Sequence, residues 1–256
     1  MTHLARRSAL TALAGLPLAA VLADPRLARA AAEGLEEVTL TTKGGKTVKA
    51  ALALPASTPA PSVVLIHEWW GLNDQIKSVA AELAKAGYVS LAVDLYDGKV
   101  AGGGDRESAR SYMQAVVPEE ASDTLVSWAD WLKAHETASG KIGTVGWCFG
   151  GGWSLNASIA TPVDATVVYY GRVNRSAEDL KALKGPVLGH FAESDQWINK
   201  DMVGGFEKAM QAAGKTYENH WYDADHAFAN PTSARYDEGD AKLAWDRTLA
   251  FFQANL

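Results

Sequence analysis

The chain has 256 residues, 48% of them apolar and 21% charged, and its formal net charge at pH 7 is −6. This length and apolar fraction fit one globular domain with a sizeable core. An acidic balance without a cluster of basic residues excludes the electrostatic footprint that a nucleic-acid partner requires, so we expect no such partner.

The first 30 residues have the pattern of an export leader. Arg6-Arg7 precedes an apolar run over residues 9–23, and small residues dominate residues 27–31. A basic start, an apolar core of about 15 residues and small residues at its end are typical of a signal peptide, which is too short to span a membrane. We therefore expect a leader at residues 1–30, a mature domain at residues 31–256 and no stable membrane anchor.

The paired arginines indicate the twin-arginine route, which exports proteins that have already folded. Thr2 and Ala5 match the flanks of that signal poorly, and Ala9 stands where a large apolar residue is usual. A frayed amphipathic N-terminal helix is the alternative interpretation of this segment. Export places the protein in the periplasm or outside the cell.

Beyond the leader, the apolar periodicities predict strands that alternate with helices. The predicted strands cover residues 38–42, 48–54, 63–66, 88–93, 142–145, 163–170, 186–191 and 217–222. The predicted helices cover residues 75–86, 107–117, 121–135, 151–160, 200–213 and 237–252. Uninterrupted apolar runs such as residues 63–66 are typical of strands buried on both faces. The alternation predicts an α/β fold, with a mostly parallel, doubly wound sheet and helices on both faces of a single domain.

The stretch Lys141 to Trp153 carries the clearest chemical pattern. A short apolar strand runs into the turn Gly146-Trp147-Cys148-Phe149-Gly150, and a helix follows. The pattern G-x-C-x-G-G is that of a nucleophile elbow with cysteine in place of serine, in which a strained turn lifts the side chain above the sheet. The helix N-terminus behind the turn favours a thiolate and offers N–H groups to an oxyanion. A lone cysteine is, however, often a small buried apolar residue.

Two further residues favour a catalytic interpretation of Cys148. Asp195 and His226 follow it in the order nucleophile, acid, base, which is the order of α/β-hydrolases, and each of the three follows a predicted strand. Because chemistry gathers at the carboxyl ends of parallel strands, one fold would bring them together. His226 would then take the thiol proton and Asp195 would orient the imidazole. Cys148 is also the only cysteine, so no disulfide can form within the chain.

With these residues in place, the sequence resembles the dienelactone hydrolases, an α/β-hydrolase family with a cysteine nucleophile. The matching stretches are His67-Glu68-Trp69-Trp70-Gly71-Leu72-Asn73, Asp94-Leu95-Tyr96, Gly146-Trp147-Cys148-Phe149-Gly150-Gly151, Tyr169-Tyr170-Gly171, Glu193-Ser194-Asp195 and Asp225-His226-Ala227-Phe228. The resemblance implies hydrolysis of an ester or lactone through an acyl-thioester. It also implies that Glu68 pairs with the thiol region at rest and helps to generate the thiolate, and that the backbone N–H groups of Phe149 and Trp69 form the oxyanion hole.

The sequence departs from this family where the substrate is held. Members that act on chloroaromatic breakdown products carry two arginines for the substrate carboxylate. Here those places read Asp97-Gly98-Lys99 and Asn230. An amide does not replace a bidentate guanidinium, and Lys99 is only a point charge. We therefore do not expect the carboxylated dienelactone as substrate. The candidate substrate-binding residues are Tyr96, Trp197, Asn230 and Lys99.

Two other functions remain open at this stage. A non-catalytic secreted binding protein could use the same scaffold, and the fold also supports peptide-bond cleavage, for which no added domain is visible. The six histidines are scattered without ligand spacing, so we expect no metal and no cofactor. The expected partner is a small-molecule ester or lactone, and the expected assembly is a monomer or a weak homo-oligomer.

Overall fold

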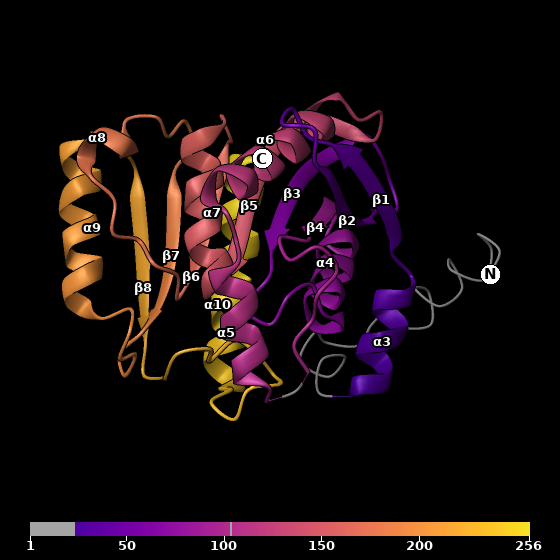
Figure 1. Ribbon diagram of the computed structural model, residues 1–256. Coiled ribbons are helices and arrows are strands. Elements are labelled where there is room, and N and C mark those ends of the chain that lie inside the picture. Colours follow the sequence, from indigo (N-terminus) through magenta and orange to yellow (C-terminus); the bar gives the residue numbers. More distant parts are fainter. Residues whose placement is uncertain (1–23, 103) are drawn as a thin grey trace. The chain divides into compact units, whose positions relative to one another are not determined.

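The computed structural model of the chain describes residues 24–102 and 104–256. The expected leader lies outside these described residues up to residue 23. The described residues form two compact units, which divide between Gly140 and Lys141. Helices and strands are mixed along the chain, and from β3 (Ala60–Ile66) onward the strands pair in parallel, which confirms the predicted α/β class (Figure 1). The prediction of one domain over residues 31–256 stays a prediction.

The strands of the first unit combine a hairpin with a parallel pair. They are β1 (Glu36–Thr41), β2 (Thr47–Ala53), β3 (Ala60–Ile66) and β4 (Val89–Val93), in the order β1-β2-β4-β3. The predicted hairpin is confirmed, because β1 and β2 pair in antiparallel fashion. Strand β2 is also antiparallel to β4, whereas β3 and β4 are parallel.

The helices of the first unit are α3 (Pro25–Glu33), α4 (Asp74–Lys85), α5 (Arg106–Gln114) and α6 (Pro118–Ala134). The side chain of Asn73 caps α4 by accepting the N–H of Ile76 at 3.1 Å. Helix α4 packs against β2, β3 and β4, and α6 packs against β3. Helix α6 begins at Pro118 and not at the predicted residue 121, because proline fits the first turn of a helix, where its missing N–H costs nothing.

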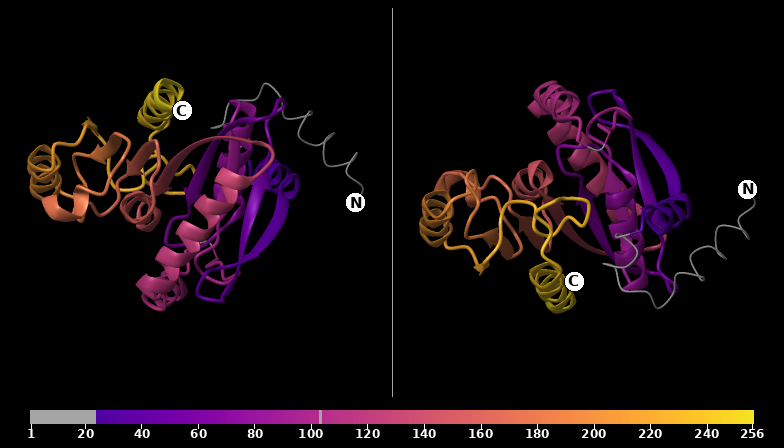
Figure 2. Two further views of the ribbon diagram at one scale, coloured as in Figure 1. Left: turned by 90° about the horizontal axis from the view of Figure 1, so that it is seen from above. Right: turned by 90° about the horizontal axis from the view of Figure 1, so that it is seen from below.

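The second unit is a run of parallel strands. They are β5 (Ala138–Trp147), β6 (Ala165–Tyr169), β7 (Val187–Ala192) and β8 (Tyr217–Tyr222), in the order β5-β6-β7-β8. The helices are α7 (Phe149–Ala160), α8 (Ala177–Leu180), α9 (Lys200–Ala212) and α10 (Glu238–Asn255). Helices α7 and α10 both pack against β6, on opposite faces of the strands (Figure 2). The carboxyl ends of all four strands therefore meet at one edge.

A buried hydroxyl cluster ties α7 to the strands beneath it. The Oγ of Ser154 lies 2.9 Å from both the carbonyl oxygen of Val167 and the Oγ1 of Thr144. Ser158 links the same Thr144 at 3.0 Å to Thr166 at 2.6 Å. Because buried polar groups are costly unless they are bonded, these contacts fix the position of α7 on β5 and β6.

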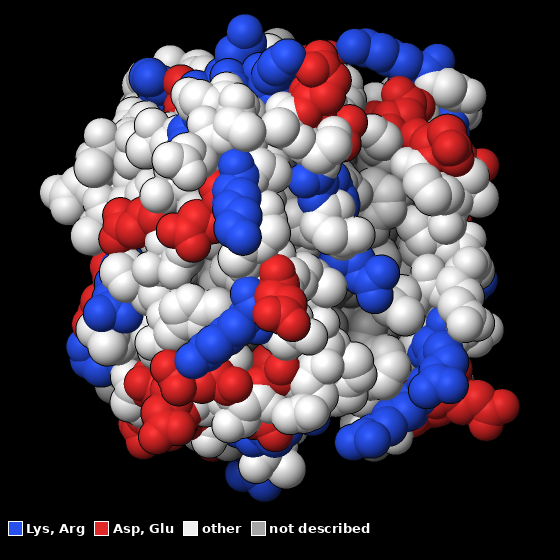
Figure 3. Space-filling view, turned by 90° about the vertical axis from the view of Figure 1, so that its left-hand side faces the viewer, with Lys and Arg blue, Asp and Glu red and all other residues white. Residues whose placement is uncertain are grey.

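The surface shows no broad field of one sign on the face drawn in Figure 3. Lysine and arginine side chains are interspersed there with aspartate and glutamate, and wide stretches carry neither. Among the helices that the structure describes, none combines the length and apolar character that a membrane span needs.

Gly146 provides a test of the packing at the end of β5. A Cβ at Gly146 would collide with the carbonyl group of Gly150, whereas a Cβ at Gly205 in α9 would meet nothing within 4 Å. Gly146→Ala should lower the free energy of unfolding by about 2 kcal/mol or more, because backbone cannot move aside cheaply. Gly205→Ala should raise it by about 0.5–1 kcal/mol through helix propensity. Urea denaturation of both variants measures the difference, and equal effects would contradict the packing described.

Candidate active site

Cys148 lies at a strained turn between β5 and α7. Its backbone has φ 54° and ψ −114°, a conformation that a non-glycine residue rarely adopts. The turn is held because the N–H of Cys148 donates to the carbonyl oxygen of Tyr169, 3.0 Å away at the end of β6. Phe149 opens α7, so its N–H lies at the positive end of the helix dipole.

Left-handed backbone is concentrated around this edge of the second unit. Cys148, Tyr170 and Ala227 have φ values of 54°, 36° and 68°, and among the described residues only one other non-glycine residue, Asp97, has a positive φ. Each such residue costs about 1–3 kcal/mol and persists only where the surroundings hold it. Strain of this kind clusters at functional sites, so the three positions mark the edge as a candidate site.

Both carboxylate oxygens of Asp195 take part in hydrogen bonds. Its Oδ2 lies 2.6 Å from Nδ1 of His226, and its Oδ1 accepts the N–H groups of Trp197 at 2.8 Å and Ile198 at 3.0 Å. Burial alone would raise the pKa of Asp195, but the hydrogen bond and charge of His226 together with the two backbone donors outweigh it and lower that pKa. The charged carboxylate thus keeps a proton on Nδ1 of His226 and leaves Nε2 for another partner.

That other partner is Cys148. Burial lowers the pKa of His226, but hydrogen bonds to the side chains of Asp195 and Cys148, with their charges, outweigh burial and raise this pKa to about 10. A histidine with such a pKa carries its proton at neutral pH. The structure therefore brings Cys148, His226 and Asp195 into one hydrogen-bonded row within the second unit.

Aromatic rings hold His226 in place. The ring of Tyr170 lies 5.1 Å from that of His226, and Trp197 meets His226 edge-on, also at 5.1 Å. Trp197 is 59% exposed, and the guanidinium of Arg235 lies over its ring at 5.6 Å. Trp197 thus borders His226, and its expected contact with substrate stays a prediction. Arg235 was missed, because no local pattern signals a cation that stacks on a distant ring.

Asn230 faces inward in the loop that follows His226. It is buried, and its Oδ1 accepts the N–H of Thr232 at 2.9 Å and the hydroxyl of the same residue at 2.7 Å. The side-chain oxygen of Asn230 thus holds the backbone of its own loop in place. Its expected contact with substrate stays a prediction.

Glu68 and Trp69 lie in the first unit, directly after β3. Glu68 is buried, and its carbonyl oxygen accepts a bond of 2.6 Å from Nδ1 of His67, whose Nε2 accepts the N–H of Leu95 at 3.2 Å. Burial lowers the pKa of His67, so the ring is neutral and ties the end of β3 to the end of β4. Trp69 is half-buried against Trp70, with 4.8 Å between ring centroids.

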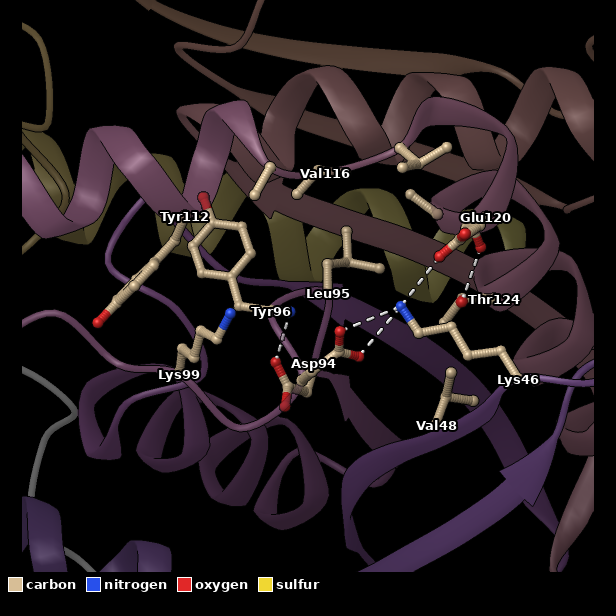
Figure 4. A pocket seen from close by; sticks show the side chains of 14 residues that line it. Lys46, Val48, Asp94, Leu95, Tyr96, Lys99, Tyr112, Val116, Glu120 and Thr124 are labelled. Carbon is tan, nitrogen blue, oxygen red and sulfur yellow. Dashed lines mark hydrogen bonds and ion pairs between the residues drawn. The ribbon is translucent and has the colours of Figure 1, made fainter.

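Tyr96 and Lys99, both expected to bind substrate, line one cavity of about 120 Å³ in the first unit (Figure 4). The ammonium of Lys99 lies 5.8 Å from the ring centroid of Tyr112. At the other end, Lys46 is shared at 3.2 Å between Asp97 and Glu120. The structure thus places Tyr96 and Lys99 together, and their contact with substrate stays a prediction.

A buried network of polar side chains, which the sequence did not predict, connects the strands of the second unit beneath the carboxyl edge that carries Cys148. The Nδ1 of His190 lies 2.8 Å from the hydroxyl of Tyr222, its Nε2 lies 3.0 Å from that of Thr248, and Thr248 bonds Tyr169 at 2.6 Å. Arg247 donates to Tyr222 at 3.1 Å. Tyr169 is the residue whose carbonyl group holds Cys148, so the network links α10 to the cysteine turn.

The family model of the dienelactone hydrolase family matches residues 48–256. The chain belongs to this family. A carboxymethylenebutenolidase of Pseudomonas putida is 28% identical to this member, and the match covers 84% of this chain and 95% of the relative. The protein usf of Aquifex pyrophilus is 32% identical, and the match covers 84% of this chain and 96% of that relative.

A solved structure from Klebsiella pneumoniae subsp. pneumoniae, assigned as a dienelactone hydrolase, has a TM-score of 0.78 and 27% identity. The match covers 86% of this chain and 98% of the chain in the Klebsiella structure. The α/β-hydrolase fold predicted from the sequence is therefore confirmed. This member of the dienelactone hydrolase family is an enzyme of the ester- and lactone-hydrolysing type.

His190 makes the stability of this dienelactone hydrolase family member depend on pH. Burial, followed by the charges of His220 and Arg247, lowers the pKa of His190 well below its usual value. Its contribution to stability is thus complete above the unfolded pKa of about 6.5 and is lost as the pH falls below it. The stability advantage of the wild type over His190→Gln should shrink by about 1.4 kcal/mol per pH unit below that point. Urea denaturation from pH 7.5 to 5 measures this advantage, and a constant value would contradict the neutral ring.

Proposed function

We propose that this enzyme hydrolyses carboxylic ester or lactone bonds of small molecules with Cys148 as nucleophile, His226 as acid and base, and Asp195 as the residue that orients His226. One observation carries the proposal. Asp195, His226 and Cys148 form a continuous row of hydrogen bonds at the carboxyl edge of the parallel strands. Each residue has the chemistry that its place in the row requires.

The reaction begins with the thiolate of Cys148, which attacks the carbonyl carbon and forms a tetrahedral oxyanion. The intermediate collapses by breaking the bond to the alcohol oxygen, which takes the Nε2 proton of His226 and leaves an acyl-thioester. A water molecule then gives a proton to the same Nε2 and attacks the thioester. Release of the acid restores the thiolate, and the carboxylate of Asp195 stabilises each imidazolium that forms.

The oxyanion is stabilised in this proposal by the backbone N–H groups of Phe149 and Trp69. The position of Phe149 at the first turn of α7 supports its share, because N–H groups at a helix N-terminus point outward and carry a partial positive charge. The share of Trp69 rests on the family resemblance. Donors of this kind contribute about 3–4 kcal/mol each to the transition state.

The substrate is an uncharged or aromatic ester or lactone rather than the carboxylated dienelactone. Asn230 uses its carbonyl oxygen within its own loop, and Gly98 has no side chain, so neither offers the fork of donors that a carboxylate needs. The half-exposed ring of Trp197 beside His226 supports an apolar or aromatic contact. We further propose that the enzyme is exported to the periplasm or the exterior and acts as a monomer or weak homo-oligomer.

Replacement of Cys148 tests the nucleophile. Cys148→Ala should lower the turnover of p-nitrophenyl acetate by about 10³-fold or more, because the acyl-thioester can no longer form. Cys148→Ser serves as the matched variant, since it keeps a hydroxyl in the same place. Initial rates across a panel of short esters and lactones measure the effect. Equal turnover by Cys148→Ala would remove Cys148 from the mechanism, and no turnover by the wild type would remove the proposed activity.

Glu68 is proposed to control the protonation of Cys148, and this role rests on the family resemblance. Removal of its charge by Glu68→Gln should shift the pH profile of Cys148 labelling by iodoacetamide, because a nearby carboxylate accepts a proton or disfavours a thiolate. Mass spectrometry of the labelled peptide at a series of pH values gives the profile. A profile identical to that of the wild type would assign Glu68 a purely structural role.

A further inference from the structure

Helix α3 lies across the place where the sequence pattern puts the end of the leader. It spans Pro25–Glu33, so the expected boundary at residue 30 falls inside it. The helix has a proper beginning, since the side chain of Asp24 accepts the N–H of Arg26 at 2.8 Å and Pro25 occupies the first position. Asp24 itself is exposed.

One face of α3 is packed like the core of the first unit. Ala31 has no exposed surface, and Ala28, Ala32 and Leu35 are also buried. The helix packs against α4, where the Oγ of the fully buried Ser78 lies 2.8 Å from the carbonyl oxygen of Ala28. Helix α3 is therefore an integrated element of the fold that covers part of α4.

The opposite face of α3 is polar. Arg29 and Glu33 form an exposed ion pair at 2.9 Å, one turn apart. A helix with an apolar face on α4 and a charged face toward water has the pattern of an ordinary surface helix of a globular domain. The small residues that resemble the end of a leader thus have a second explanation, because alanine allows close packing of two helices.

A cut after residue 30 would destroy this element. It would leave Ala31 to Glu33 ahead of Gly34, which is less than one helical turn and cannot sustain a helix alone. Ser78 would lose its contact with the carbonyl oxygen of Ala28 and keep only the one with Asp74 inside α4, and the face of α4 beneath α3 would become exposed. In addition, a packed helix presents no extended backbone to a peptidase, so a folded exported chain would be protected at this point.

We propose that α3 belongs to the mature enzyme and that the leader is removed by hydrolysis of the peptide bond between Ala23 and Asp24. The sequence before this bond, Val21-Leu22-Ala23, places a small residue directly before the cut, whereas Ala28-Arg29-Ala30 has small residues at both positions of the small-x-small pattern. The choice of the earlier bond therefore rests on the packing of α3 and not on this pattern. The new amino group then lies at Asp24, in front of the intact helix. The inference rests on export and is independent of the hydrolase mechanism.

The amino terminus of the exported protein tests this proposal. The full chain is produced in a bacterium that can export it, and the exported form is analysed by N-terminal sequencing and intact mass. We expect a terminus at Asp24. A terminus at Ala31 or later, or a chain that retains residues 1–23, would overturn the proposal. Ester hydrolysis of the same sample is measured separately, so failure of processing and failure of the activity are distinguishable.

Paired variants of the full chain sharpen the result. Ala23→Leu puts a bulky residue before the proposed bond and should make the uncleaved precursor accumulate, whereas Ala30→Leu should be processed like the wild type. The reverse pattern would place the cut after Ala30.

In the mature protein, Ala31→Asp should lower the midpoint of thermal unfolding by several degrees and Ala30→Asp should change it much less, because Ala31 is buried and Ala30 is half-exposed. Equal midpoints would show that α3 adds nothing to the mature fold.

Discussion

The hydrogen bond between Asp195 and His226 is the interaction on which the proposed chemistry depends. Its 2.6 Å length reflects a carboxylate whose other oxygen is already held by two backbone N–H groups, so it cannot turn away. A buried charge of this kind is tolerated because both carboxylate oxygens of Asp195 have hydrogen-bond partners. The arrangement presents Nε2 of His226 to Cys148 in a single orientation, which makes the raised pKa of about 10 possible.

The parallel strands of the second unit make that arrangement possible. Cys148, Tyr170 and Ala227 all follow strand ends, and each has a strained backbone that packing must hold. The cysteine turn is held by the carbonyl group of Tyr169, and the ring of Tyr169 is in turn held by Thr248 and His190. Rigidity beneath the edge therefore offsets strain at the edge, a combination expected of a preorganised site.

The parts of this fold that could be predicted were those with a local signature. The glycine pattern around Cys148 specified the turn, and apolar runs such as Val63 to Ile66 specified buried strands. Interactions between segments far apart in the sequence could not be predicted: nothing near His190 indicates Thr248, and nothing near Trp197 indicates Arg235. Helix α3 could not be predicted for a different reason: its small residues suit both the end of a leader and a closely packed helix.

The central claim is that a covalent acyl-thioester forms on Cys148, and trapping it is the most direct measurement. The enzyme is mixed with excess p-nitrophenyl ester, quenched in acid within milliseconds and digested, and the peptide that contains Cys148 is examined by mass spectrometry. The account predicts an acyl adduct on Cys148 that neutral hydroxylamine removes, together with a burst of p-nitrophenol equal to the enzyme concentration. An adduct on another residue, or turnover with neither burst nor adduct under conditions that slow deacylation, would contradict it.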